Sequence, residues 1–155
     1  MKTKQKLFKI GFISISMIAV FMFSSCEDDK DEDKKLTINN VVAENHDGGT
    51  EIPIGGTISV DFEVEAGEAK LDYYHIEIHD HPASGKVEDE YKIIDDDFKE
   101  KSTFKGLRNA HVHEHITVPE KANLGPYHVV ITVVDEDGYS VETEDLETHV
   151  TIVSK

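Results

Sequence analysis

The chain has 155 residues and a formal net charge of −16, with 32 acidic side chains against 16 Lys and Arg. This charge repels nucleic acid and anionic membrane surfaces and favours cations and basic partners, so we expect no nucleic-acid partner. The single cysteine excludes a disulfide within the chain.

Residues 1–25 have the pattern of a bacterial lipoprotein signal peptide. Four lysines precede an apolar run at residues 10–23, which is too short and wrongly flanked for a stable membrane-spanning helix. The sequence Phe23-Ser24-Ser25-Cys26 resembles a lipobox, although phenylalanine stands where leucine is usual. The resemblance implies cleavage before Cys26 and its lipidation; the alternative is an ordinary signal peptide with a chance cysteine.

Residues 26–35 predict a disordered acidic tether, because such a charged run cannot bury apolar surface. Loss of the four signal-peptide lysines lowers the net charge to −20. An acidic run behind a lipidated cysteine is similar to the surface-export signal of Bacteroidota lipoproteins, and a solvated spacer is the alternative. We therefore expect an outer-membrane, lipid-anchored protein that faces the cell exterior. An outer-membrane transporter or an extracellular ligand is the expected partner.

The mature region begins with strand patterns. A short strand is expected at residues 36–42, followed by a turn-rich segment and Gly55-Gly56. Residues 58–65 then alternate apolar and acidic or polar side chains, which is typical of a half-buried antiparallel strand.

A second alternating strand is predicted at residues 71–79, with Tyr74 on its apolar face. A long excursion follows at residues 81–109, and long connections in compact domains tend to be functional or mobile. Within it we expect an edge strand at residues 87–94. The acidic run at residues 95–97 is expected to be a solvated loop.

Three further strands are expected towards the C-terminus. Residues 110–118 and 127–134 carry apolar side chains at alternate positions, and residues 135–138 form a tight turn. The last strand covers residues 139–153 and is expected to break near Asp145.

These elements predict one all-β domain at residues 36–155, an immunoglobulin-like antiparallel β-sandwich of about seven strands. In such a sandwich the third strand pairs with the penultimate strand, here residues 71–79 with residues 127–134. The sequence does not decide whether the strand at residues 110–118 lies in the same sheet.

The order of motifs along the domain resembles DUF4625, an uncharacterised family of Bacteroidota lipoproteins. The motifs are Gly55-Gly56, the Tyr-x-Ile-x-Ile-His strand, the block Asn-x-His-x-His-x-His-Ile-x-Val-Pro, Gly-Pro-Tyr-His-Val and Asp-x-x-Gly. The resemblance covers residues 36–153 and implies an immunoglobulin-like sandwich and a surface lipoprotein. It implies no activity.

The chain holds nine histidines, and strand positions place most of them on faces turned away from the core. Imidazoles at alternate strand positions can bind one ion, and an all-imidazole site suits zinc or copper. The candidate metal ligands are His79, His81, His111, His113, His115 and His128. Additional candidates are His75 and the carboxylates of Glu77, Asp80 and Glu114, whereas His46 and His149 are expected to be ordinary surface residues.

The sequence favours a binding module over an enzyme. The run from Ala110 to Glu114 resembles only a short part of the copper–zinc superoxide dismutase signature, and a blue-copper site needs a cysteine, which Cys26 cannot supply once lipidated. Two hypotheses remain: a surface module that holds a metal ion or a metal-bearing ligand such as haem, and a structural or adhesion module whose histidines only make a sheet face polar.

Overall fold

The computed structural model describes residues 35–143 and 148–155, so the signal peptide, Cys26, most of the acidic tether and the expected break near Asp145 lie outside the described residues. No helix of this part is long and apolar enough to cross a membrane. Its elements are β1 (Thr37–Asn45), β2 (Glu51–Pro53), β3 (Thr57–Glu65), β4 (Leu71–Asp80), the 3-10 helix η1 (Val87–Asp89), β5 (Lys92–Phe98), β6 (Asn109–Thr117), β7 (Gly125–Asp135), β8 (Ser140–Glu142) and β9 (His149–Val153).

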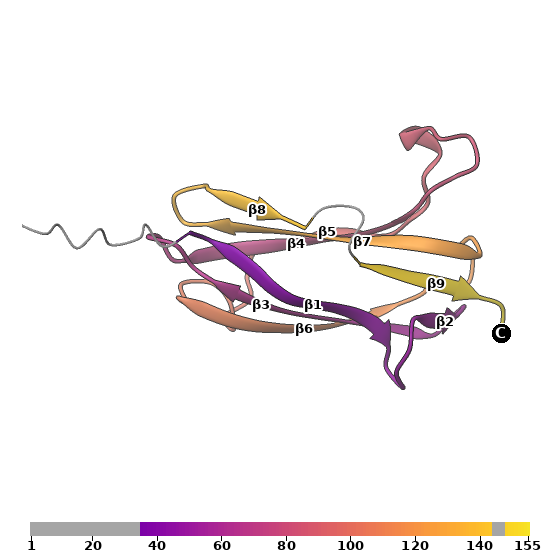
Figure 1. Ribbon diagram of the computed structural model, residues 1–155, viewed down its shortest axis with the longest axis horizontal. Coiled ribbons are helices and arrows are strands. Elements are labelled where there is room, and N and C mark those ends of the chain that lie inside the picture. Colours follow the sequence, from indigo (N-terminus) through magenta and orange to yellow (C-terminus); the bar gives the residue numbers. More distant parts are fainter. Residues whose placement is uncertain (1–34, 144–147) are drawn as a thin grey trace, which may run out of the picture.

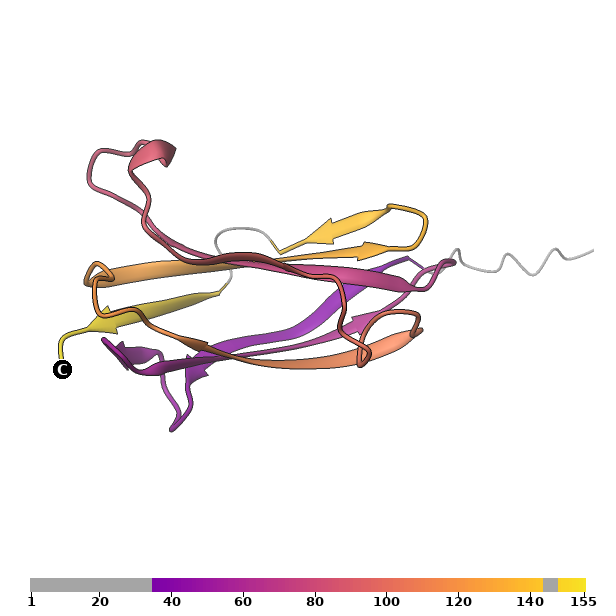
Figure 2. The same ribbon diagram turned by 180° about the vertical axis from the view of Figure 1, so that it is seen from behind.

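The strands form two layers, which confirms the prediction of an all-β sandwich (Figure 1). One sheet has the order β1-β3-β6, and the other has the order β2-β9-β7-β4-β5 with β8 paired to β7. All pairings are antiparallel except β2 with β9, which run parallel and which the sequence pattern did not predict. The view from behind shows β6 at the edge of the smaller sheet (Figure 2).

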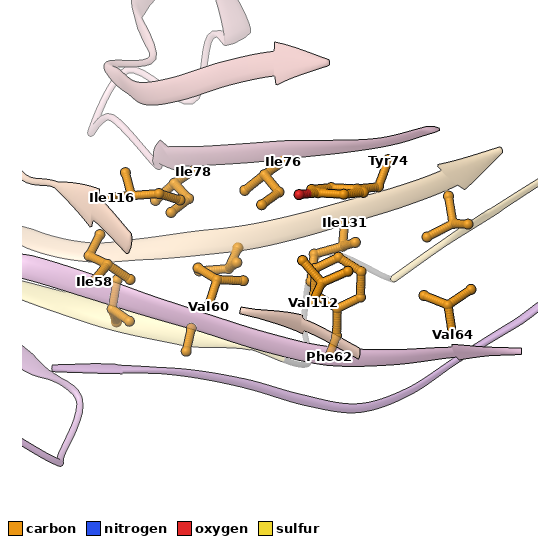
Figure 3. Close-up of a cluster of buried hydrophobic side chains, with 14 of the residues drawn as sticks. Ile58, Val60, Phe62, Val64, Tyr74, Ile76, Ile78, Val112, Ile116 and Ile131 are labelled. Carbon is orange, nitrogen blue, oxygen red and sulfur yellow. The ribbon is translucent and has the colours of Figure 1, made fainter. Parts of the chain in front are cut away.

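The core lies between the sheets and is made by the apolar faces that the alternation predicts (Figure 3). In β3, Ile58, Val60 and Phe62 are fully buried, and in β4 Tyr74 and Ile76 are equally inaccessible. Because successive strand residues point to opposite faces, burial of these side chains turns the polar positions of both strands towards solvent.

The assignment of β6 to a sheet decides how the histidines are grouped. β4 pairs with β7, as predicted, and with β5 on its other side. β6 pairs instead with β3 in the smaller sheet. The histidines of β6 and those of β4 therefore lie on opposite outer faces of the sandwich.

The long excursion is more ordered than its sequence predicts. The strand expected at residues 87–94 begins only at Lys92 and continues through Asp95, Asp96 and Asp97 to Phe98. The expectation of a loop is therefore wrong, whereas the three aspartates are exposed to solvent as expected. Cations on the neighbouring positions offset the carboxylates: Lys92 lies 2.7 Å from Asp95, and Lys99 lies 2.7 Å from Asp97.

The Gly55-Gly56 pair allows the chain to cross from β2 in one sheet to β3 in the other. Gly55 has a φ of 76°, which L side chains rarely adopt. A Cβ on Gly56 would lie 2.7 Å from the carbonyl oxygen of Pro53, closer than a side chain tolerates. Both glycines are thus required by the local backbone.

Candidate metal sites

Four histidines gather on the outer face of the smaller sheet, and we call them the β6 cluster: His46, His111, His113 and His115. Three of them alternate along β6 because Val112 and Ile116 between them enter the core. In the β3–β6 register, His113 lies opposite Asp61 and His115 lies opposite Ser59. The cluster is open to solvent.

Asp61 and the two imidazoles of His113 and His115 form a line of short contacts. The Nδ1 atom of His113 lies 2.7 Å from Oδ1 of Asp61, and its Nε2 atom lies 3.0 Å from Nε2 of His115. The same Asp61 oxygen lies 3.5 Å from Nε2 of His111. One carboxylate therefore contacts two of the three β6 histidines.

This arrangement constrains the tautomer of His113. A carboxylate only accepts hydrogen bonds, so Nδ1 of His113 donates to Asp61. In the neutral ring, Nε2 then carries a lone pair that faces His115. Two imidazole nitrogens bound tetrahedrally to one zinc ion lie about 3.3 Å apart, since each Zn–N bond is about 2.0–2.1 Å. The observed spacing of 3.0 Å is close to this value.

His46 approaches the same pair from the turn after β1. Its ring centroid lies 5.0 Å from that of His115, with the planes at 79°. The sequence indicated an ordinary surface residue here, because the turn gave no hint of which strand it approaches. Asn45 at the end of β1 pairs with Ile58, which pairs with Ile116, so the turn after β1 starts one strand away from His115.

A second group, the β4 cluster, lies on the outer face of the larger sheet: His79, His81, His128 and His149. His79 and His128 are paired in register on β4 and β7 and are 7% and 8% exposed. The ring of His128 lies 4.0 Å from that of His81 and 4.4 Å from that of His149. Four imidazoles thus cover one corner of this sheet.

Carboxylates lie close to histidines on this outer face of the larger sheet. Two groups bring three ligand atoms within 4.8 Å of one another: His75 with Glu77 and Asp95, and Glu77 with His79 and Glu90. These groups could hold a metal ion. In the first group, however, both ring nitrogens of His75 are already engaged, by Asp95 at 3.2 Å and Asp97 at 2.9 Å.

Two of the carboxylates predicted as oxygen ligands, Glu114 and Asp80, form hydrogen bonds within the fold instead. Glu114 lies on the opposite side of β6 from its histidines, where it accepts hydrogen bonds from Tyr74 and Lys101, both at 2.6 Å. Burial, together with the Glu114 contact, raises the pKa of Tyr74. Asp80 is buried, and both of its oxygens accept hydrogen bonds from Tyr91 and Asn123. Neither carboxylate is placed as a ligand to the histidines.

The family model of a domain of unknown function, DUF4625, matches residues 24–153. The chain belongs to this family. Among curated proteins, none matches the DUF4625 chain.

Several solved structures are similar to the DUF4625 domain at low sequence identity. A DUF4466 family protein from Parabacteroides merdae has a TM-score of 0.47 and 12% identity, over 71% of this chain and 42% of that chain. Spo0M, a sporulation control protein from Bacillus subtilis, has a TM-score of 0.48 and 9% identity, over 78% and 50%. The chain thus spans half or less of the length of each of these two proteins.

The histidines predicted as ligands in the DUF4625 domain do not form one site. His111, His113 and His115 lie in the β6 cluster, whereas His79, His81 and His128 lie in the β4 cluster. Sequence reasoning missed His46, His149, Asp61 and Glu90 as neighbours of these groups. For Asp61 a signal existed, because it shares the polar face of β3.

A cavity of about 480 Å³ lies elsewhere, between the start of β1, the β3–β4 connection and the β7–β8 hairpin. It is lined by Leu36, Ala69, Tyr139 and Val141 among others, and none of the histidines lines it. The histidine clusters of the DUF4625 domain therefore lie apart from this cavity: the β6 cluster is exposed, whereas His79 and His128 of the β4 cluster are buried.

Proposed function

We propose that this DUF4625 protein is a lipid-anchored module of the outer membrane, facing the cell exterior, that binds a zinc or copper ion through His113 and His115. The observation that carries the proposal is the pair of Nε2 atoms 3.0 Å apart, with Asp61 on Nδ1 of His113. A carboxylate on the second nitrogen of a ligating imidazole orients the ring and raises its basicity. His46 is the nearest candidate for a third ligand.

Imidazole nitrogens suit zinc and copper, and a formal charge of −16 attracts cations to an exposed site. The geometry of the sandwich fits the proposed anchoring. β1 starts opposite the end of β3, because Thr37 pairs with Glu65, whereas His115 pairs with Ser59 near the start of β3. A chain anchored at Cys26 would present the histidine pair away from the membrane.

Calorimetry with the full-length chain in mild detergent tests the proposal. We expect saturable binding of Zn²⁺ and Cu²⁺, and we expect His115→Asn to weaken it by at least tenfold. Asp61→Asn keeps the shape of the side chain but removes its charge, and loss of such an orienting partner costs about 10- to 100-fold in affinity.

His111→Asn is the matched control, because His111 shares the strand and the face but stands outside the close Nε2 pair. We expect its affinity to change much less than that of His115→Asn. Equal affinities for the unchanged chain, His115→Asn and Asp61→Asn would contradict the metal proposal. They would favour the adhesion alternative, in which one imidazole simply donates a hydrogen bond to the other.

A further inference from the structure

We propose a second metal site of different chemistry, formed by Glu77, His79 and Glu90 on the face opposite the β6 cluster. One ligand atom of each residue lies within 4.8 Å of the other two. This site goes beyond the proposed function, because it shares no residue with the His113–His115 pair.

The state of His79 points to a ligand. The residue is 7% exposed, and its buried Nδ1 atom forms no hydrogen bond within the described part of the chain. Oε1 of Glu77 lies 3.1 Å away, at ion-pair distance but without a hydrogen bond. A buried nitrogen without a hydrogen bond costs free energy, and a metal ion bound by both the imidazole and the Glu77 carboxylate would satisfy it.

The fold places the third ligand, Glu90, by hydrogen bonds that do not involve it. Glu90 ends η1 in an extended conformation, with φ of −65° and ψ of 134°. The next residue, Tyr91, is tied to Asp80 by two backbone contacts: its N–H donates to the carboxylate at 2.7 Å, and its carbonyl accepts from Asp80 N–H at 3.1 Å. The return of the excursion is therefore fixed beside His79.

The ammonium group of Lys92 would compete with a metal ion for the carboxylate of Glu77. Its Nζ atom lies 2.9 Å from Oε1 of Glu77 and 2.7 Å from Oδ2 of Asp95. These hydrogen bonds, that to Asp95 first, raise the pKa of Lys92 and keep it charged. A divalent ion at Glu77 would displace the ammonium towards Asp95, so removal of the lysine charge should favour metal binding.

One imidazole and two carboxylates suit manganese better than an all-imidazole pair does, because carboxylate oxygen is a preferred ligand of Mn²⁺. Mn²⁺ is therefore a probe that distinguishes this site from the His113–His115 pair. Its binding would also tie the excursion at residues 81–91 to β4, since Glu90 and Glu77 belong to the two segments.

The test is titration of the full-length chain with Mn²⁺, followed by the electron paramagnetic resonance signal of the free ion. We expect Glu90→Gln to weaken binding by about tenfold or more and Lys92→Met to tighten it by at least threefold. Glu88→Gln is the matched control: it removes the same charge two residues away, where the carboxylate faces only Lys86 at 3.8 Å.

A second readout locates the ion. Mn²⁺ should broaden the His79 ring resonances before those of His113 and His115. Three outcomes overturn the inference: no saturable binding, equal effects of Glu88→Gln and Glu90→Gln, or no gain from Lys92→Met. A misfolded variant would not bind Mn²⁺ more tightly, so misfolding cannot produce the gain in affinity expected of Lys92→Met. If His115→Asn left Zn²⁺ binding unchanged, the proposed function would fail but this second site would still stand.

Discussion

Removal of the Asp80 carboxylate should destabilise the domain more than removal of Asp72, a partly exposed acid on the same strand. Asp80 is 7% exposed at the end of β4. It accepts one hydrogen bond from the Tyr91 backbone and one from the Asn123 side chain, both at 2.7 Å. One residue therefore holds both the returning excursion and the loop between β6 and β7.

The expected magnitude follows from these two bonds. Each hydrogen bond to a charged group contributes about 1.5–3 kcal/mol net, so Asp80→Ala should lower the free energy of unfolding by about 3–6 kcal/mol. Domains of comparable size lose about 3–5 °C of melting temperature per kcal/mol, which predicts a fall of about 10–30 °C.

Urea and thermal unfolding of the full-length chain measure both quantities. Asp72→Ala is the control, because Asp72 is on the same strand and pairs with exposed Lys105 at 3.1 Å; we expect little change there. Asn123→Ala should give an intermediate loss, since it removes only one of the two bonds. An Asp80→Ala midpoint equal to that of Asp72→Ala would refute the reasoning.

Three further predictions concern individual side chains. Tyr74→Phe should cost about 1–2 kcal/mol in urea unfolding, because the buried ring remains but the hydrogen bond to Glu114 is lost; an unchanged midpoint would contradict this. Burial raises the pKa of Tyr127 to about 12. The native state should therefore lose stability as the pH rises from 10 to 12, because this tyrosine ionises first in the unfolded chain. Ultraviolet absorbance at high pH measures the ionisation, and an ordinary tyrosine pKa for Tyr127 would contradict the prediction. Hydrogen bonding from Lys99 lowers the pKa of Asp97. The contribution of the Asp97 carboxylate to stability should therefore be present above about pH 4 and be lost below it as the carboxylate is protonated. NMR of the carboxyl carbons should show a higher pKa for Asp97 in Lys99→Ala than in the unchanged chain.

The strands themselves could be predicted because each presents one unbroken apolar face. In β3, Ile58, Val60, Phe62 and Val64 repeat every second residue, and that period is sufficient to define both the strand and its buried side. The pairing of β4 with β7 followed from the general pattern of the sandwich. Local periodicity and common topology therefore gave most of the fold.

The sheet that contains β6 could not be predicted, because its alternation is compatible with either neighbour. Pairing depends on contacts between distant segments, such as Ser59 with His115, that no local pattern encodes. The two candidate sites could not be predicted from the sequence for the same reason. Glu90 reaches His79 only through the Asp80–Tyr91 contacts, and His46 reaches His115 only through the turn after β1.

The acidic run in β5 was misjudged for a different reason. Asp is unfavourable in strands on average, so three in succession indicated a loop. The neighbouring side chains reverse that preference, since Lys92, Lys99 and His75 face the carboxylates across or along the sheet. A propensity describes a residue alone, whereas this strand is stabilised by its pairs.

The position of β9 has a consequence for how the chain folds. β9 lies between β2 and β7, and within the described residues β2 pairs with β9 alone. Synthesis from the N-terminus makes β2 available long before β9. Until then β2 and the part of β7 from Gly125 to His128 are unpaired strand edges, which are prone to pair with other chains. The larger sheet therefore closes only after the C-terminal residues have been made, when β9 pairs with β2 and β7 together.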